Sequence, residues 1–351
     1  MTRRICLFAV FLITFLFLRV PVEGVGSLHP VGGVFKKTSY QCVFRSMVED
    51  SSGRLWAGTF GAGLFSFDGK KWTHIASSPN ALPDDRLSKL LIAKSDDSKL
   101  FIATAGGGAC QFDLVKETWS PLGNSPELSS RHFHAFLHLS DGRFLLGSVG
   151  DGLFVGRGQS WKHYGEPDGL PSAWINDAAT ASDGVLIATS EGLALLKNDR
   201  ITDVELPCGS WTDGAVNVIA LFHDEWFLGT ASGGLIGRTI DPKAPAAGLP
   251  LWKTRRYRRI PGISGSVHAL LPDCDTLWVA AETGLFSFDG TSEPVKMDGP
   301  WKPEEAFKCL LKRQNGQFIA GTADGRLYAK SANTPWTTLF DYSNFSQEVV
   351  K

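Results

Sequence analysis

Histidines and carboxylates are the residues of this sequence that could carry acid–base chemistry. His134 and His268 lie within apolar runs, whereas Glu191 and Glu282 lie in short polar turns. An imidazole paired with a carboxylate can exchange protons near neutral pH. No G-x-S-x-G elbow, H-E-x-x-H motif or phosphate-binding glycine loop accompanies them. These four residues are therefore acid–base candidates only if the fold assembles a site from distant segments.

Metal binding has weaker support in the sequence. His132, His134 and His138 would point to one side of a strand, but neighbours on one face are about 7 Å apart, and no carboxylate belongs to the pattern. We interpret the three as a buried or channel-facing row. The recurring Asp–Gly pairs are typical of tight turns, and no calcium-binding loop of the D-x-D-x-D-G type is present. We expect neither a metal ion nor a cofactor.

The cysteines favour buried thiols over cross-links. Five of the six follow residue 26, and they are widely spaced, without a C-x-x-C pair. This pattern argues against a disulfide framework and against a zinc site. Cys110 and Cys309 lie in strand-like runs, so we expect them to be small buried hydrophobic residues.

A repeated phrase indicates which elements position these side chains. Residues 55–69 read L-W-A-G-T-F-G-A-G-L-F-S-F-D-G, and residues 277–290 repeat most of it. Two short apolar runs around a glycine-containing turn predict a hairpin. A small residue ends the first run in seven copies, which start 41–51 residues apart: Thr59, Thr104, Ser148, Thr189, Thr230, Ala281 and Thr322.

A period of about 40–45 residues with several short strands is typical of a β-propeller blade. We therefore predict an all-β fold, a seven-bladed β-propeller of four-stranded antiparallel blades. The predicted blades span residues 43–76, 88–122, 132–165, 174–206, 215–260, 266–298 and 306–340. In such a ring the first strand of each blade would line a central channel.

The repeat resembles the two-component regulator propeller repeat. Residues 50–72 match most of its D-x-x-G-x-L-W-x-G-T…G-L…F-D-G…W pattern, and residues 161–174 match its connecting G-L-P segment. The resemblance spans residues 43–340 and is strong in the first, fourth and sixth repeats. It implies the propeller of a sensor ectodomain. Here we expect a single seven-bladed propeller without a kinase part.

The chain ends and the net charge bound the setting of the protein. Residues 1–26 carry Arg3 and Arg4, followed by an apolar run over residues 5–18. This pattern predicts a cleaved signal peptide, with an uncleaved signal anchor as the alternative. We expect a propeller over residues 27–342, a polar tail over 343–351 and a secreted or periplasmic location without stable membrane insertion. Residues 28–40 could latch the last blade. With 35 Lys and Arg against 36 Asp and Glu, nucleic acid is not an expected partner.

The rim of the channel is the predicted binding site. Amides, imidazoles, carboxylates and indoles there suit a polar ligand with apolar faces, so a glycan, a peptide or an envelope protein is the expected partner. The predicted rim residues are Arg45, His134, Trp174, Asn176, Glu191, Trp211, Asn217, His268 and Glu282. A non-catalytic binding module, sensor-like or scaffold, is the leading interpretation. One alternative is a propeller lyase or hydrolase acting on a polysaccharide or a related polymer. Another is that these are ordinary turn and channel residues around trapped water.

Overall fold

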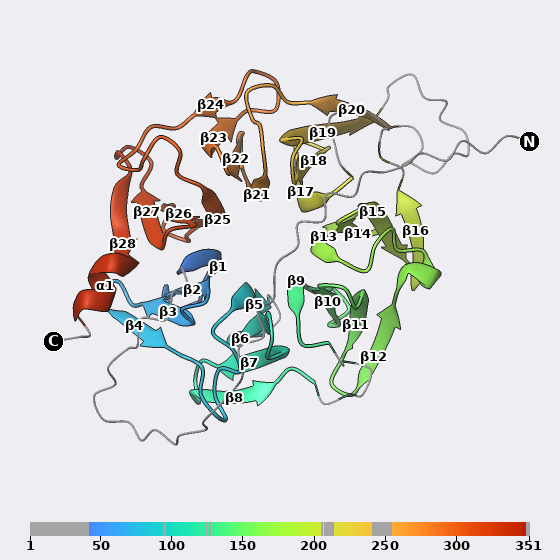
Figure 1. Ribbon diagram of the computed structural model, residues 1–351, viewed down its shortest axis with the longest axis horizontal. Helices are drawn as coiled ribbons and strands as arrows, with labels where there is room; N and C mark the ends of the chain where they lie inside the picture. The colour runs from blue at the N-terminus through green and yellow to red at the C-terminus, as the bar shows by residue number, and fades with distance from the viewer. Residues whose placement is uncertain are drawn as a thin grey trace, which may run out of the picture. The chain divides into compact units, whose positions relative to one another are not determined.

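Four-stranded antiparallel sheets follow one another along the chain and form a ring of seven blades (Figure 1). The computed structural model describes residues 42–93, 96–123, 125, 128, 130–204, 206, 214–240 and 255–348. The predicted fold class is confirmed, and the blade boundaries agree with the predicted ones to within a few residues. The predicted signal peptide, the segment 28–40 and Trp211 lie outside the described residues.

The blades contain these strands: β1 (Val43–Glu49), β2 (Leu55–Phe60), β3 (Leu64–Phe67), β4 (Trp72–Ile75); β5 (Leu87–Ala93), β6 (Asp96–Thr104), β7 (Ala109–Asp113), β8 (Thr118–Pro121); β9 (Phe133–His138), β10 (Phe144–Ser148), β11 (Leu153–Arg157), β12 (Ser160–Tyr164); and β13 (Ile175–Ala181), β14 (Gly184–Thr189), β15 (Gly192–Lys197), β16 (Arg200–Val204). They continue as β17 (Val216–Phe222), β18 (Glu225–Thr230), β19 (Leu235–Ile240), β20 (Arg255–Arg259); β21 (Val267–Asp273), β22 (Thr276–Ala281), β23 (Gly284–Phe288), β24 (Val295–Lys296); and β25 (Phe307–Lys312), β26 (Phe318–Thr322), β27 (Arg326–Lys330), β28 (Thr337–Asp341). A 3₁₀ turn covers Glu166–Asp168, and the helix α1 covers Tyr342–Glu348.

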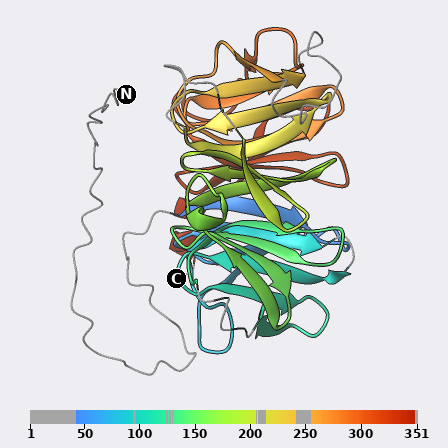
Figure 2. The ribbon, with the colours of Figure 1, turned by 90° about the vertical axis from the view of Figure 1, so that its right-hand side faces the viewer.

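The first strand of each blade is the innermost one. Each of these strands contacts the first strand of the next blade, and β1 contacts β25 to complete the circle (Figure 1). Strands two to four then follow outward in sequence order. The side view shows the sheets stacked face against face (Figure 2). A residue near the beginning of any first strand is therefore placed beside the ring axis.

The hydrophobic core is divided among the contacts between neighbouring blades. Seven clusters of buried apolar side chains are found in the described part of the chain, and each draws on two adjacent blades. For example, Trp56 and Leu64 of the first blade pack with Leu100 and Ile102 of the second. Because a single blade leaves both faces of its sheet apolar, it buries them only by stacking in the ring.

The repeated small residue closes the turn between the second and third strands. Thr59 Oγ1 donates a hydrogen bond to Gly63 O at 2.8 Å and accepts one from the Ala62 amide at 3.0 Å. The other hydroxyl-bearing copies also donate to a turn carbonyl: Thr104, Ser148, Thr189, Thr230 and Thr322. All six are fully buried, and buried turn groups need such partners. Ala281 lacks the hydroxyl and still occupies the same buried position.

Among the described strands the first and last blades share none, because β1–β4 and β25–β28 form separate sheets. On one side, Arg313 of the last blade contacts Glu49 and the Gly53 carbonyl of the first. On the outer side, Phe340 and Phe345 pack on Phe65 of β3. Part of the segment expected to be a polar tail therefore forms α1, because its aromatic residues complete the cluster between the first and last blades.

The described cysteines are free thiols. Cys42, Cys110 and Cys309 are buried, whereas Cys274 is exposed. Burial in apolar surroundings raises the pKa of the Cys110 and Cys309 thiols to about 12, so both stay protonated at neutral pH. The expectation that Cys110 and Cys309 are small buried residues is confirmed.

Candidate functional site

Every innermost strand contains a register shift at the same place. One residue of the strand pairs with the small turn residue, the next residue is left unpaired, and the residue after that resumes the ladder. Such a bulge leaves its extra residue out of the ladder and re-aims the side chain. All seven extra residues are polar: Arg45, Ser88, His134, Asn176, Asn217, His268 and Lys308. We call this set the bulge ring.

Part of the bulge ring is tied to the next blade by one repeated hydrogen bond. Asn176 Nδ2 donates to Val216 O at 2.9 Å, and Asn217 Nδ2 donates to Val267 O at 3.2 Å. Ser88 Oγ donates to Phe133 O at 2.5 Å in the same way. Each acceptor is the residue just before the bulge of the following blade. These three side chains therefore hold neighbouring blades together by hydrogen bonds, and they belong to the innermost strands of the ring.

A polar chain joins the fifth, sixth and seventh blades. Asn217 Nδ2 lies 3.0 Å from Ser266 Oγ, which lies 3.4 Å from His268 Nδ1. His268 Nε2 is 2.7 Å from Lys308 Nζ. At the outer end, Glu282 Oε2 accepts a weak hydrogen bond, 3.4 Å long, from the Ser266 amide. Ser266 thus links the predicted site residues Asn217, His268 and Glu282, and Lys308 extends the contacts beyond His268.

Burial and nearby positive charge together set the protonation of His268 and Lys308 in this polar chain. Burial, followed by the positive charges of Lys308 and Arg45, lowers the pKa of His268 to about 3. Burial and Arg45 likewise lower the pKa of Lys308 to about 8, although Glu282 opposes the shift. At neutral pH His268 is therefore neutral, and its Nε2 accepts the hydrogen bond that the Lys308 ammonium donates.

His134, in the bulge of the third blade, also has a lowered pKa. Burial, and then Arg45 and Lys89, lower the pKa of His134 to about 4. The neighbouring first-strand residue His138 instead packs against the Phe144 ring, with centroids 4.9 Å apart. In the described part of the chain no group of three His, Cys, Asp or Glu side chains is placed to hold a metal ion.

Arg45 connects the bulge ring to the rim. Its Cζ lies 5.5 Å from the centre of the Phe60 ring, a cation–π distance. Its Nε is buried without a hydrogen-bond partner among the described residues. Burial also lowers the pKa of Arg45 below its usual value.

The rim is built from the turns after the second strands and the segments before the first strands. Val149 forms an isolated bridge with Trp174, and Phe60 forms one with Arg86. Phe60, Val149 and Trp174 are exposed, Trp174 by 55%, although all three are large and apolar. Glu191 and Glu282 are exposed in turns on the same rim. The rim therefore combines apolar faces with carboxylates above the polar bulge ring.

The predicted site residues include five members of the bulge ring but not Ser88 or Lys308. The bulge lies thirteen or fourteen residues before the small turn residue in six blades, which points to Arg45, His134, Asn176, Asn217, His268 and Lys308. In the second blade a further register shift near Ala93 lengthens the spacing, so the bulge residue is Ser88. A longer hairpin cannot be recognised from spacing alone.

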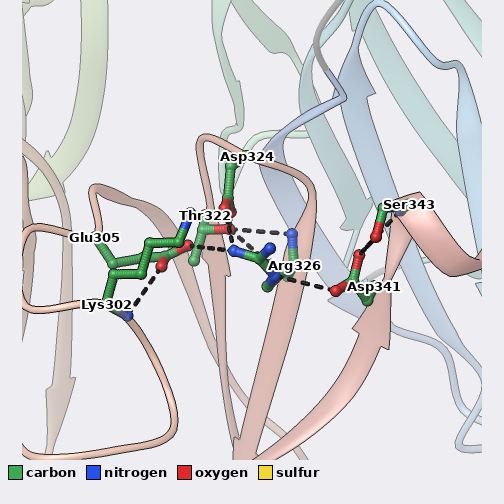
Figure 3. A network of polar contacts seen from close by, with 7 residues as sticks. All are labelled: Lys302, Glu305, Thr322, Asp324, Arg326, Asp341 and Ser343. Atoms are coloured by element: carbon green, nitrogen blue, oxygen red, sulfur yellow. Dashed lines mark hydrogen bonds and ion pairs between the residues drawn. The ribbon is translucent and has the colours of Figure 1, made fainter.

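A second polar cluster lies at the rim of the last blade. Glu305, Asp324 and Arg326 point toward one another beside a pocket of about 580 Å³ (Figure 3). Burial and the Asp324 carboxylate raise the pKa of Glu305. Partial burial opposes ionisation of Asp324, but hydrogen bonds from Glu305 and Thr322 lower its pKa. The pKa of Glu305 is therefore raised and that of Asp324 lowered. Arg326 also bonds Asp341 at 3.1 Å and ties the cluster to β28.

The turn of the first blade explains the conspicuous D-x-x-G-x-L-W sequence. Asp50 is buried, and its carboxylate accepts hydrogen bonds from the Ser52 and Arg54 amides and from Trp56 Nε1 at 2.8 Å. One side chain thereby fixes both the turn and the indole. Residues 39–61 match the model of the family described as two component regulator propeller. The chain carries the two component regulator propeller repeat.

Solved structures with this architecture include sensor domains. The extracellular domain assigned to a one component system of B. thetaiotaomicron has 18% identity and a TM-score of 0.66, over 85% of this chain and 42% of that one. A hybrid two component system of the same organism gives 17% identity and a TM-score of 0.68, over 84% and 40%. The chain therefore spans less than half the length of these proteins.

Other propellers of similar size share the fold. Virginiamycin B lyase from Staphylococcus aureus has 11% identity and a TM-score of 0.61, over 82% of this chain and 94% of the lyase. YCF48 from Cyanidioschyzon merolae has 13% identity and a TM-score of 0.63, over 84% and 97%. No curated protein sequence matches. At these identities the likeness establishes the fold, while function depends on the site.

Proposed function

We propose that this protein is an exported, sensor-like binding module that holds its ligand at the rim of the propeller without transforming it. The observation that carries the proposal is the exposed indole of Trp174, two residues before the bulge residue Asn176. Large apolar side chains left exposed in a group mark binding surfaces in soluble proteins. The two component regulator propeller repeat and the extracellular sensor domains of the same fold support the same interpretation.

A glycan or a peptide suits this rim better than a wholly apolar ligand. Trp174 and Phe60 offer flat exposed faces for stacking, and the bulge residues Asn176 and Asn217 carry amide groups. Sugar rings have apolar faces and polar edges, and peptides alternate apolar side chains with amides. The turn carboxylates of Glu191 and Glu282 would add hydrogen-bond acceptors.

Binding arrays test the proposal directly. The purified full chain would be applied to glycan and peptide arrays, together with Trp174→Ala and the matched control Val295→Ala, which removes an exposed apolar side chain from the outer strand β24. We expect binding that falls at least tenfold in Trp174→Ala and is kept in Val295→Ala. Absence of any bound glycan or peptide, or equal binding by Trp174→Ala, would overturn the proposed rim site.

Export is a separate part of the proposal. In the described part of the chain no helix is long and apolar enough to cross a membrane. The basic and apolar start of the sequence predicts removal near residue 26. Mass spectrometry of the protein recovered from the periplasm or medium should give a new N-terminus close to that residue. A protein that stays in the cytoplasm with Met1 intact would contradict export.

The pair of His268 and Lys308 favours a second candidate, a lyase or hydrolase acting on a polysaccharide or a related polymer. A neutral imidazole beside an amine with a pKa of about 8 provides a base and an acid in hydrogen-bond contact. Turnover of any glycan found on the arrays, lost in His268→Ala with binding retained, would establish this candidate. Binding without turnover by the wild type would exclude it for that glycan.

A further inference from the structure

The bulge ring carries an uneven distribution of charge. Arg45 and Lys308 are consecutive members of it, because the last blade is followed in the ring by the first. The other five members are Ser88, His134, Asn176, Asn217 and His268, and none of them is a carboxylate. Two cationic side chains thus lie side by side on the inner face, with uncharged polar groups around them. We call Arg45 and Lys308 the cationic pair.

The charged residues Lys89, Asp177 and Glu282, described near the bulges, each have a partner. Lys89 Nζ lies 3.7 Å from Asp177 Oδ1, and the second oxygen of Asp177 accepts the Ile219 amide at 3.1 Å. Glu282 interacts with Lys308 through space, but it is exposed on the rim and accepts the Ser266 amide. No ion pair to Arg45 or Lys308 is found among the described residues.

The arrangement is costly for the folded protein in isolation. Partly buried like charges repel one another, and an arginine cannot shed its proton to relieve the strain. Burial first, and then nearby positive charge that includes Arg45, lowers the pKa values of His134, His268 and Lys308. A buried charge without a counter-charge is a pattern that proteins retain mainly where function requires it.

Arg45 is also oriented for an anion. Its Cζ lies over the Phe60 ring, and its Nε–H, which lies in the plane of the guanidinium, has no acceptor among the described residues. A guanidinium donates to oxyanions in that plane, often through two parallel hydrogen bonds. The Lys308 ammonium donates one of its three N–H groups to His268 Nε2, which leaves N–H donors for a ligand.

We propose that the cationic pair Arg45 and Lys308 binds an oxyanion carried by the ligand, with His268 holding the Lys308 ammonium in place. This inference rests on the proposed function and narrows its ligand to an acidic one, such as a uronic acid or a sulfated or phosphorylated sugar. Carboxylate is a planar group and sulfate and phosphate are tetrahedral groups, and all three present several negatively charged acceptor oxygens to such a pair. Trp174 and Phe60 on the rim would then contact the uncharged part of the ligand.

The amine of Lys308 reports occupancy by itself. A bound anion stabilises the ammonium, so it raises the pKa of Lys308 and slows acylation of its amine at pH 8. The full chain would be trace-labelled with acetic anhydride at constant ionic strength and analysed by mass spectrometry, with Lys116, whose side chain is 76% exposed, as the internal reference. The probes are chloride, acetate, sulfate and phosphate, and the matched sugars methyl galactoside, methyl galacturonide, glucose 6-sulfate and glucose 6-phosphate.

We expect at least one acidic sugar to slow labelling of Lys308 threefold or more relative to Lys116, while methyl galactoside has no effect. Arg45→Gln should abolish this protection. Lys312→Gln, which removes a charge from the other end of the same strand, should keep it. Protection by the free anions would mean that the anionic group suffices, whereas protection by acidic sugars alone would mean that the sugar is also required. Both results support the pair.

The inference is overturned if no anionic probe slows labelling of Lys308. It is also overturned if the protection persists in Arg45→Gln. This failure is separate from failure of the proposed function. Array binding of neutral glycans that depends on Trp174, without protection of Lys308, would leave the binding module standing and exclude the oxyanion site. Protection of Lys308 together with empty arrays would establish the anion site and contradict the rim as the place where a glycan or peptide binds.

Discussion

Arg313 Nε lies 2.9 Å from Glu49 Oε1, although 264 residues separate them in sequence. Both side chains are nearly buried, and Arg313 also reaches the Gly53 carbonyl at 2.7 Å. The Gln314 amide donates to the other Glu49 oxygen at 2.6 Å. This cluster joins the turn of the last blade to that of the first and closes the ring at the edge farther from the bulges.

Removing one partner of this closure should destabilise the whole ring. We expect Glu49→Ala to lower the free energy of unfolding by about 3 kcal/mol, because it leaves the buried Arg313 charge unpaired. Lys116→Ala, which removes an exposed ion pair, should change it by less than about 0.5 kcal/mol. Urea denaturation of the full chain measures both. Equal effects of the two variants would show that the closure does not depend on this pair.

The aromatic contacts between the last and the first blade lead to a second prediction. Phe340 is 5% exposed and contacts Phe44, Phe65 and Trp72. Truncating it leaves a cavity, so we expect Phe340→Ala to cost about 3–5 kcal/mol. Val115→Ala, at a side chain that is 80% exposed, serves as the control and should be near neutral. Unchanged thermal unfolding of Phe340→Ala would contradict the packing of the last blade on the first.

The turn hydroxyls can be tested with an isosteric change. Thr59→Val keeps the shape but removes a donor and an acceptor from a fully buried turn, leaving the Ala62 amide and the Gly63 carbonyl without that partner. We expect a loss of about 1–3 kcal/mol in unfolding free energy. The same substitution at the exposed Thr73 should have little effect. If both variants unfold like the wild type, the hydroxyl has no structural role and the repeat needs another explanation.

The histidines of the bulge ring predict a dependence of stability on acid. The pKa of His134 is about 4 in the folded protein, below the usual 6.5, so the unfolded chain binds more protons between these pH values. Stability contributed by this site is therefore complete above about pH 6.5 and falls as the pH drops toward 4. We expect His134→Gln to flatten the fall of unfolding free energy between pH 6.5 and 4.5. Parallel pH profiles of the variant and the wild type would refute the shift.

The sequence by itself determined the repeat, the blade count and most of the bulge ring. Buried turn hydroxyls such as Thr59 recur because each turn needs the same hydrogen bonds, and local requirements of this kind leave a periodic trace. Counting back from that trace found Arg45, His134, Asn176, Asn217 and His268, since the first hairpin has nearly constant length.

Only the tertiary structure decided which of these side chains interact and how the ring closes. Lys308 reaches His268 because their blades are neighbours in the ring, and Arg45 Nε is left without a partner among the described residues. Arg313 pairs with Glu49 because the circle brings the last blade beside the first. No spacing in the sequence records a contact between its two ends. For the same reason α1, read as a polar tail, could not be recognised as the element whose aromatic residues cover β3.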